Sequence, residues 1–153
     1  MRNLLHKFLT GAMALPAVLA FGALLTTSQN ANAQVGGCTL ASLNGSYASH
    51  LFGEVIGNSA GYTPGPFATS GRWTFDGAGN ITVNDTVNYN GSVSNRTLTG
   101  NYTVDSSTCR AVVTFTTGAP GNQATLYPSP SGNFATVVVT NPAFVVVNGQ
   151  LYK

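Results

Sequence analysis

The feature that most constrains the fold is a regular alternation of apolar and polar side chains along the chain. In residues 67–75 the odd positions carry the large apolar groups, and the even positions carry Ser, Thr and Arg. The pattern resumes at residues 81–83, after the Gly-rich turn at residues 76–80. A period of two is typical of a strand with one wet face and one dry face. No segment shows a sustained helical period, so the chain is predicted to be all-β.

Eight segments carry this pattern, with Thr, Val and aromatic enrichment that favours strands. They are residues 45–55, 66–75, 80–89, 96–104, 110–117, 123–127, 133–140 and 143–152. Short polar links such as Asn90-Gly91 predict hairpins between them, and Asn148-Gly149 predicts a turn that breaks the last segment. We therefore expect a single small antiparallel up-and-down β-barrel of about eight strands. A two-sheet sandwich is the alternative.

The first 33 residues have the three-part layout of a secretory signal. A basic start is followed by an apolar run at residues 9–25 and by the small-residue triplet Ala31-Asn32-Ala33. We predict a helical signal peptide over residues 1–33, cleaved after Ala33, and a barrel domain over residues 34–153. The product would be secreted or periplasmic, with no stable membrane span after cleavage. A membrane anchor, or a lipid attached to Cys38, are the alternatives.

The predicted mature domain carries no net charge. Its charged residues are the basic Arg72, Arg96, Arg110 and Lys153 and the acidic Glu54, Asp76, Asp85 and Asp105. The absence of a basic patch argues against nucleic acid and anionic membranes as partners. Only 7% of the whole chain is charged. The wet face is instead Thr, Ser and Asn, which leaves little charge repulsion against association with itself or with a surface.

The chain has two cysteines, Cys38 and Cys109. An even count in an exported protein predicts a disulfide between them. This bond would tie the start of the domain to a strand near its middle. Two free thiols are the alternative.

Four stretches carry a family resemblance: residues 38–47 (CTLASLNGSY), residues 71–80 (GRWTFDGAGN), residues 100–104 (GNYTV) and Cys109. On these the chain resembles exported bacterial proteins with an allene oxide cyclase-like (calycin-like) β-barrel domain, over about residues 38–152. The resemblance implies the barrel fold and no particular activity. The plant enzymes of this fold class resemble lumenal isomerases that use a Glu near the barrel mouth. An isomerase would therefore need Glu54, the chain's only Glu, inside the lumen.

Few residues suggest catalysis or metal binding. His50 and Glu54 share the wet face of the first segment, opposite Leu51, and are predicted to be solvated. The three Asp residues could suggest calcium, but they lack the ligand spacing, and turn chemistry explains the Asp and Gly of residues 76–80. Arg72 and Arg96 are also predicted to be solvated. No nucleophile elbow, phosphate loop or dinucleotide fingerprint is present, so we expect neither cofactor nor metal, and binding rather than catalysis.

Six aromatic residues are the candidate ligand-binding residues: Trp73, Phe75, Tyr89, Tyr102, Phe115 and Phe134. In a barrel this small we expect them to pack as a closed core, and the alternative is that they line a cavity for a small apolar ligand. The expected function is an exported barrel that binds such a ligand or a surface component. The alternatives are the isomerase, a structural or adhesive surface protein, and an outer-membrane barrel with its dry face outward.

Overall fold

The computed structural model describes residues 37–58 and 61–153, and the predicted signal peptide lies outside the described residues. Within them, a short 3-10 helix η1 (Leu40–Leu43) precedes eight strands. The strands are β1 (Gly45–Val55), β2 (Gly65–Phe75), β3 (Asn80–Tyr89), β4 (Ser92–Asp105), β5 (Arg110–Thr117), β6 (Gln123–Pro128), β7 (Phe134–Asn141) and β8 (Val145–Tyr152). The prediction of an all-β domain is confirmed. No helix among the described residues has the length and apolar character needed to cross a membrane.

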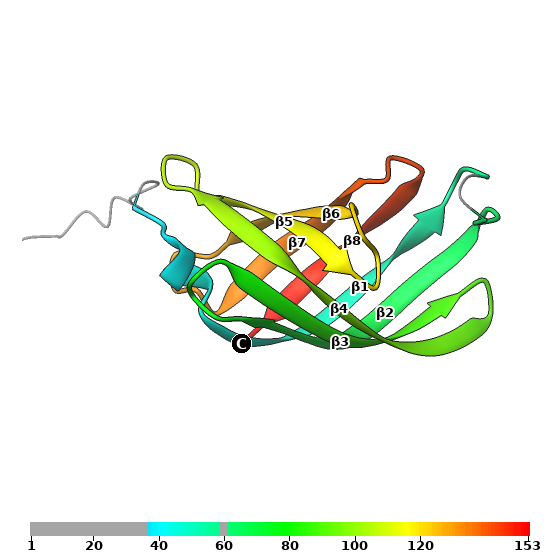
Figure 1. Cartoon of the computed structure of the whole chain (residues 1–153), viewed down its shortest axis with the longest axis horizontal. Helices are drawn as coiled ribbons and strands as arrows, with labels where there is room; N and C mark the ends of the chain where they lie inside the picture. The colour runs from blue at the N-terminus through cyan, green and yellow to red at the C-terminus, as the bar shows by residue number, and fades with distance from the viewer. Residues whose placement is uncertain (1–36, 59–60) are drawn as a thin grey trace, which may run out of the picture. The chain divides into compact units, whose positions relative to one another are not determined.

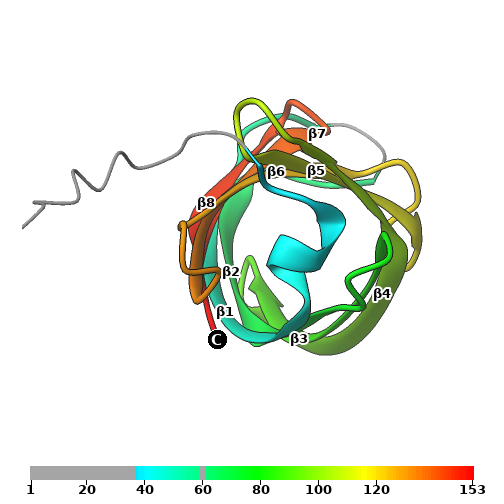
Figure 2. The ribbon, with the colours of Figure 1, turned by 90° about the vertical axis from the view of Figure 1, so that its left-hand side faces the viewer.

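The strands form one closed antiparallel barrel in sequence order. Each strand pairs with the next along the chain, as Figure 1 shows. The ring closes where β1 pairs with β8, from Ala48 opposite Tyr152 to Val55 opposite Val145. The end-on view of Figure 2 shows this ring of strands. Closure pairs the first and last strands, so the barrel prediction is confirmed over the sandwich.

The alternation of the sequence becomes the two faces of the barrel wall. Trp73 and Phe75 point inward and are buried, whereas Arg72 and Thr74 between them are exposed. The exposed face carries ladders of hydroxyl and amide groups, such as Thr97 bonded to Asn84. An outer-membrane barrel requires the reverse arrangement, with its apolar band facing outward.

Strand β4 begins four residues before the predicted start at Arg96. Residues 92–95 are all exposed, so they show no alternation from which a strand could be predicted. They pair only with β3, because the pairing of β4 with β5 covers only Thr99 to Asp105. One side of β4 therefore lacks a partner strand over residues 92–98.

The predicted turn at Asn148-Gly149 is wrong. Strand β8 continues through both residues, and Gly149 lies opposite Leu51 of β1. A side chain at Gly149 would overlap the His50 carbonyl oxygen and come within 2.7 Å of the Leu51 Cα atom. The glycine is needed here because two backbones approach closely, which is a recognised use of glycine within strands.

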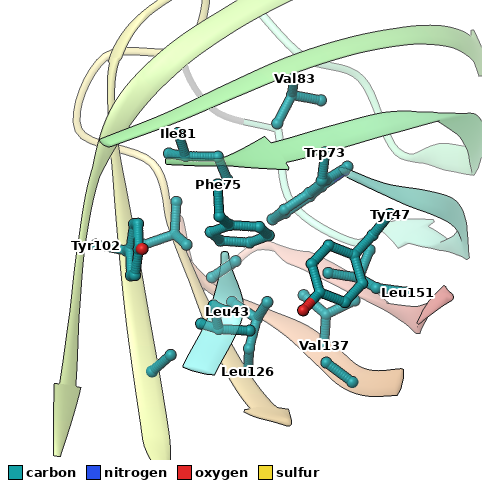
Figure 3. Close-up of a cluster of buried hydrophobic side chains, with 14 of the residues drawn as sticks. Leu43, Tyr47, Trp73, Phe75, Ile81, Val83, Tyr102, Leu126, Val137 and Leu151 are labelled. Carbon is teal, nitrogen blue, oxygen red and sulfur yellow. The ribbon is translucent and has the colours of Figure 1, made fainter. Parts of the chain in front are cut away.

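One end of the barrel, here called the closed end, is plugged. Figure 2 shows η1 lying inside the ring of strands, and Leu43 of η1 is fully buried. It belongs to the core of Figure 3 with Tyr47, Phe75 and Tyr102, and the last two rings meet edge to face at 5.1 Å. The Tyr47 hydroxyl donates to the Gly132 carbonyl (2.7 Å), and the Tyr102 hydroxyl donates to the Leu40 carbonyl (2.9 Å). These tyrosines therefore tie the plug and the β6–β7 connection to the wall.

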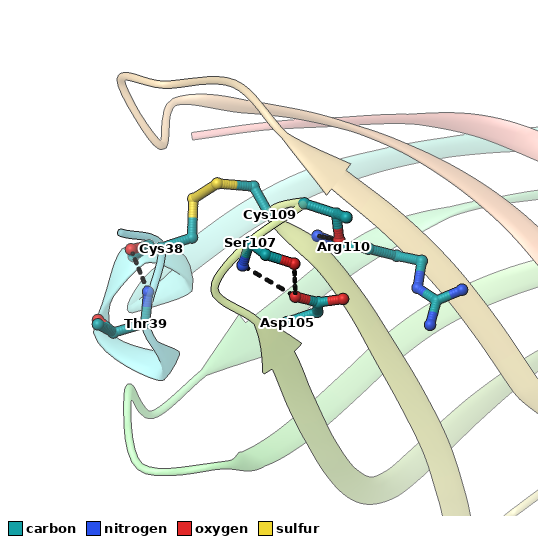
Figure 4. Close-up of a disulfide and its surroundings, with 8 residues drawn as sticks. Cys38, Thr39, Asp105, Ser107, Cys109 and Arg110 are labelled. Atoms are coloured by element: carbon teal, nitrogen blue, oxygen red, sulfur yellow. Dashed lines mark hydrogen bonds between the residues drawn. A yellow bond between two sulfur atoms is a disulfide. The ribbon is translucent and has the colours of Figure 1, made fainter. Parts of the chain in front are cut away.

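A disulfide joins Cys38, just before η1, to Cys109 in the β4–β5 connection (Figure 4). The predicted disulfide is confirmed. Neither sulfur is free, which leaves Cys38 without the thiol that a lipid anchor would need. The bond fixes the chain entering the plug to the rim of the closed end.

Candidate functional site

A cavity of about 270 Å³ occupies the other half of the barrel, here called the open end. Its mouth is lined by the connections β1–β2, β5–β6 and β7–β8, which contribute Tyr62, Ala119, Asn122 and Pro142. Its walls are inward-facing residues of all the strands. The interior is therefore closed at the η1 end and hollow at the open end, which differs from the closed core expected throughout.

Most of the cavity wall is hydrocarbon. Aliphatic residues line it from several strands: Leu51, Val55, Val87, Leu98, Ala124, Val139, Val145 and Val147. Trp73 and Phe115 also line it, with their rings edge to face at 5.8 Å. The Trp73 ring also packs against Phe75 of the closed core, with ring centroids 6.3 Å apart. Trp73 therefore lies between the packed half and the hollow half.

The β2–β4 side of the cavity carries a buried ion pair. Asp85 of β3 lies directly opposite Arg96 of β4. The Arg96 Nε atom donates to Asp85 Oδ1 at 3.0 Å, and Nη2 donates to Oδ2 at 2.7 Å. Oδ2 also accepts the Thr69 hydroxyl at 2.6 Å. The Asp85 side chain is only 2% exposed, so these contacts replace the water that it loses.

The local sequence makes room for this pair. Gly71 of β2 lies directly opposite Asp85. A side chain at Gly71 would come within 2.5 Å of the Asp85 Cα atom and 2.6 Å of its Cβ atom. Gly71 therefore lets β2 and β3 approach closely where the carboxylate turns inward.

Arg96 has donors left over after binding Asp85. Its side chain is 30% exposed and lines the cavity, with the guanidinium carbon 5.7 Å from the centre of the Phe67 ring. An arginine has five N–H groups, of which Asp85 engages two, one on Nε and one on Nη2. Nη1 makes no hydrogen bond with another residue of the described chain. The cavity thus combines apolar walls with an arginine that retains unpaired N–H donors.

The six predicted ligand-binding aromatics fall into three places. Trp73, Tyr89 and Phe115 line the cavity. Phe75 and Tyr102 belong to the closed core on the plugged side. Phe134 is half-buried and packs against the exposed Tyr152, with ring centroids 5.3 Å apart. The Tyr89 ring meets Tyr62 at the mouth, and its hydroxyl donates to the Thr63 carbonyl.

Arg96 differs from the prediction that it is solvated, because its side chain is only 30% exposed and is paired with Asp85. The sequence carries a signal for the position of Asp85 other than the calcium pattern. Asp85 has an odd residue number, as do Ile81, Val83 and Val87. An acidic residue therefore lies in the middle of the apolar face of β3. A charge at such a position requires a buried partner. Arg72 is exposed, as predicted.

The other candidates for chemistry lie away from the cavity. Glu54 and His50 are exposed on the outer face of β1, as the alternation predicts, so the carboxylate that an isomerase would need is outside the lumen. Asp76 and Asp105 are exposed at the closed end, Asp76 in the β2–β3 turn and Asp105 as the last residue of β4. No group of three or more His, Cys, Asp and Glu able to hold a metal ion occurs among residues 37–58 and 61–153.

The fold and the site define a closed eight-stranded barrel with one plugged end and one hollow end. Comparisons with protein-family models, with curated proteins and with solved structures give no match for this chain.

Proposed function

We propose that this chain is an exported, non-catalytic binding protein that holds one small, largely apolar molecule in the cavity at the open end of the barrel. The observation that carries the proposal is the hollow interior. Cavities lined by hydrocarbon with a few placed polar groups are the usual form of small-molecule sites. Export is supported by the signal-like residues 1–33 and by the disulfide, which persists in oxidising compartments.

The volume limits the size of the ligand. A cavity of about 150 Å³ holds benzene, so one of about 270 Å³ has room for roughly ten non-hydrogen atoms. The carboxylate in the lumen is engaged by Arg96 and Thr69, which argues against a free general base at this site. These features favour binding over catalysis.

Trp73 provides a direct test, because it is the chain's only tryptophan and it lines the cavity. Titration with a medium-chain ketone such as 2-nonanone should change Trp73 fluorescence saturably, at one molecule per chain. Native mass spectrometry should show the same stoichiometry.

A pair of neighbouring substitutions on β7 separates cavity binding from surface binding. Val139 lines the cavity, whereas Val138 points outward and is 41% exposed. Val139→Phe should abolish the fluorescence change by filling the cavity, and Val138→Phe should leave it intact. Equal binding by both variants, or no saturable binding by the parent, would overturn the proposal.

A second candidate, an adhesive surface protein, is favoured by one observation on the outer wall. Phe52, Val138 and Val146 are more than two-fifths exposed on adjacent strands β1, β7 and β8. These three residues are called the outer apolar patch. Exposed apolar side chains gathered on neighbouring strands can mark an interaction site. Sedimentation velocity of the parent and of Phe52→Ser tests it: self-association lost in the variant supports adhesion, and a concentration-independent monomer opposes it.

A further inference from the structure

The polar side of the cavity narrows the ligand to a chemical class, and this inference rests on the proposed function. We propose that the cavity selects a neutral molecule with a hydrogen-bond-accepting oxygen, such as a ketone, aldehyde or ester carbonyl. Hydrocarbons and carboxylates of similar size would bind less well.

The preference for an oxygen acceptor follows from Arg96. A guanidinium carries only donors, and two of its three nitrogens are already bound to Asp85. The remaining nitrogen, Nη1, belongs to a side chain that lines the cavity beside apolar Phe67 and Leu98. A donor facing an apolar ligand there would lose water without gaining a partner. A ligand carbonyl would supply the missing acceptor.

The preference for a neutral ligand follows from Asp85. Its carboxylate already neutralises Arg96 at 2.7 Å, so the pair contributes no net charge to the cavity. The other polar residues lining the cavity carry no charge: Thr69, Tyr62, Tyr89, Ser92, Ser94, Asn122 and Gln123. A carboxylate ligand would bring an uncompensated negative charge into a mostly apolar space, which is costly. A carbonyl satisfies the donor without adding charge.

The apolar walls set the position of the remainder of the ligand. Val55, Val145 and Val147 come from β1 and β8, whereas Asp85 and Arg96 come from β3 and β4. The ligand would therefore place its oxygen against the β3–β4 wall and its hydrocarbon chain against the valines and the Trp73–Phe115 pair.

The test uses three probes of closely matched size with Trp73 fluorescence as the readout. They are 2-nonanone, the alkene 2-methylnon-1-ene, in which a methylene group replaces the carbonyl oxygen, and nonanoate at neutral pH. Each is titrated into the parent and into the double variant Asp85→Leu/Arg96→Met, whose cavity wall is uncharged. The ratio of ketone affinity to alkene affinity should be about tenfold higher in the parent, the size expected for a hydrogen bond to a charged donor.

The parent alone supplies a second comparison that does not depend on a variant folding. Nonanoate should bind the parent at least about tenfold more weakly than the ketone, because it adds one unpaired charge. An equal ketone-to-alkene ratio in both proteins, or tightest binding by nonanoate, would overturn this inference while leaving the proposed function standing. Failure of all three probes to bind the parent would instead overturn the proposed function.

Discussion

At the scale of single residues, a glycine, Gly71, makes room for the Asp85–Arg96 pair inside the barrel. Gly71 leaves the space in which Asp85 turns inward, and Asp85 in turn holds Arg96 across the β3–β4 pair. Burying this ion pair costs solvation that hydrophobic residues of the same volume would not lose. Stability alone therefore does not account for its presence inside an apolar barrel, whereas the proposed ligand recognition would give it a role.

If Asp85 and Arg96 form a buried ion pair, the effects of replacing each of them on the free energy of unfolding should not add. Arg96→Met alone should lower the free energy of unfolding by about 3 kcal/mol, because it leaves the Asp85 carboxylate buried without its cation. The double variant Asp85→Leu/Arg96→Met should return to within about 1 kcal/mol of the parent, since no charge remains buried. Urea unfolding of the parent, of Arg96→Met, of Asp85→Leu and of the double variant gives the four free energies of this double-mutant cycle. Additive losses would contradict the buried-pair interpretation.

Replacing Ser49 is expected to stabilise the folded state. Its side chain points into the barrel, the residue is 4% exposed, and its hydroxyl oxygen has no hydrogen-bond partner among the described residues. Removing a buried, unpaired hydroxyl relieves a desolvation cost, so Ser49→Ala should raise the free energy of unfolding by roughly 1 kcal/mol. Ser46→Ala on the outer face, which loses a bond to the Thr74 hydroxyl, is the matched control and should not stabilise. A loss of stability in Ser49→Ala would show that the hydroxyl has a partner.

At the scale of elements, two turns at the closed end are held by aspartates. The Asp76 carboxylate accepts the Ala78 and Asn80 backbone N–H groups and the Asn80 side-chain amide. The Asp105 carboxylate accepts the Ser107 hydroxyl and backbone N–H (Figure 4). These bonds favour the ionised form. The Asn80 side chain chiefly lowers the pKa of Asp76, and the Ser107 hydroxyl chiefly lowers the pKa of Asp105 from 3.8 to about 2.

These turns predict part of the acid sensitivity of the fold. Both carboxyls bind protons less readily when folded, so their stabilisation is fully present above the unfolded pKa, near 3.8. It is lost as the pH falls through the lowered pKa of each folded carboxyl, which for Asp105 is about 2. In Asp76→Asn/Asp105→Asn the loss of stability over this window should be smaller, because the amide oxygens still accept hydrogen bonds but do not titrate. The measurement is the urea midpoint as a function of pH. An unchanged slope would contradict the assignment.

The plug at the closed end depends on the disulfide. Cys38 and Cys109 are 71 residues apart, for which the chain-entropy model gives about 4 kcal/mol of stabilisation. Cys38→Ala/Cys109→Ala should lower the free energy of unfolding by about this amount. Hydrogen exchange in the variant should rise most in η1 and in the β4–β5 connection. A variant with parental stability would show that the Leu43 and tyrosine contacts hold the plug alone.

The sequence predicts those strands that have one apolar face and one polar face. Strands β1, β3 and β5 have the predicted bounds. The sequence does not predict the start of β4, because residues 92–95 are all exposed and show no alternation. The turn expected at Asn148-Gly149 does not form because local turn chemistry yields there to the close packing of β8 against β1. Tertiary contacts thus override local preference at Asn148-Gly149.

At the scale of the whole molecule, the two ends of the barrel differ although the strands are alike. The closed end is filled by η1 and by large side chains such as Tyr47 and Phe75, while smaller residues such as Val139 and Val145 leave space at the open end. This difference depends on which inward residues meet across the barrel, and that in turn depends on strand register. The alternation indicates which residues face inward and does not indicate whether they touch, so the cavity was not predictable from it.

The most direct test of this arrangement is the location of a bound ketone by intermolecular nuclear Overhauser effects. With 2-nonanone bound, we predict contacts from its hydrocarbon protons to Trp73, Leu98 and Val147, all of which line the cavity. Contacts confined to Phe52, Val138 and Val146 on the outer apolar patch would contradict a ligand-binding barrel interior.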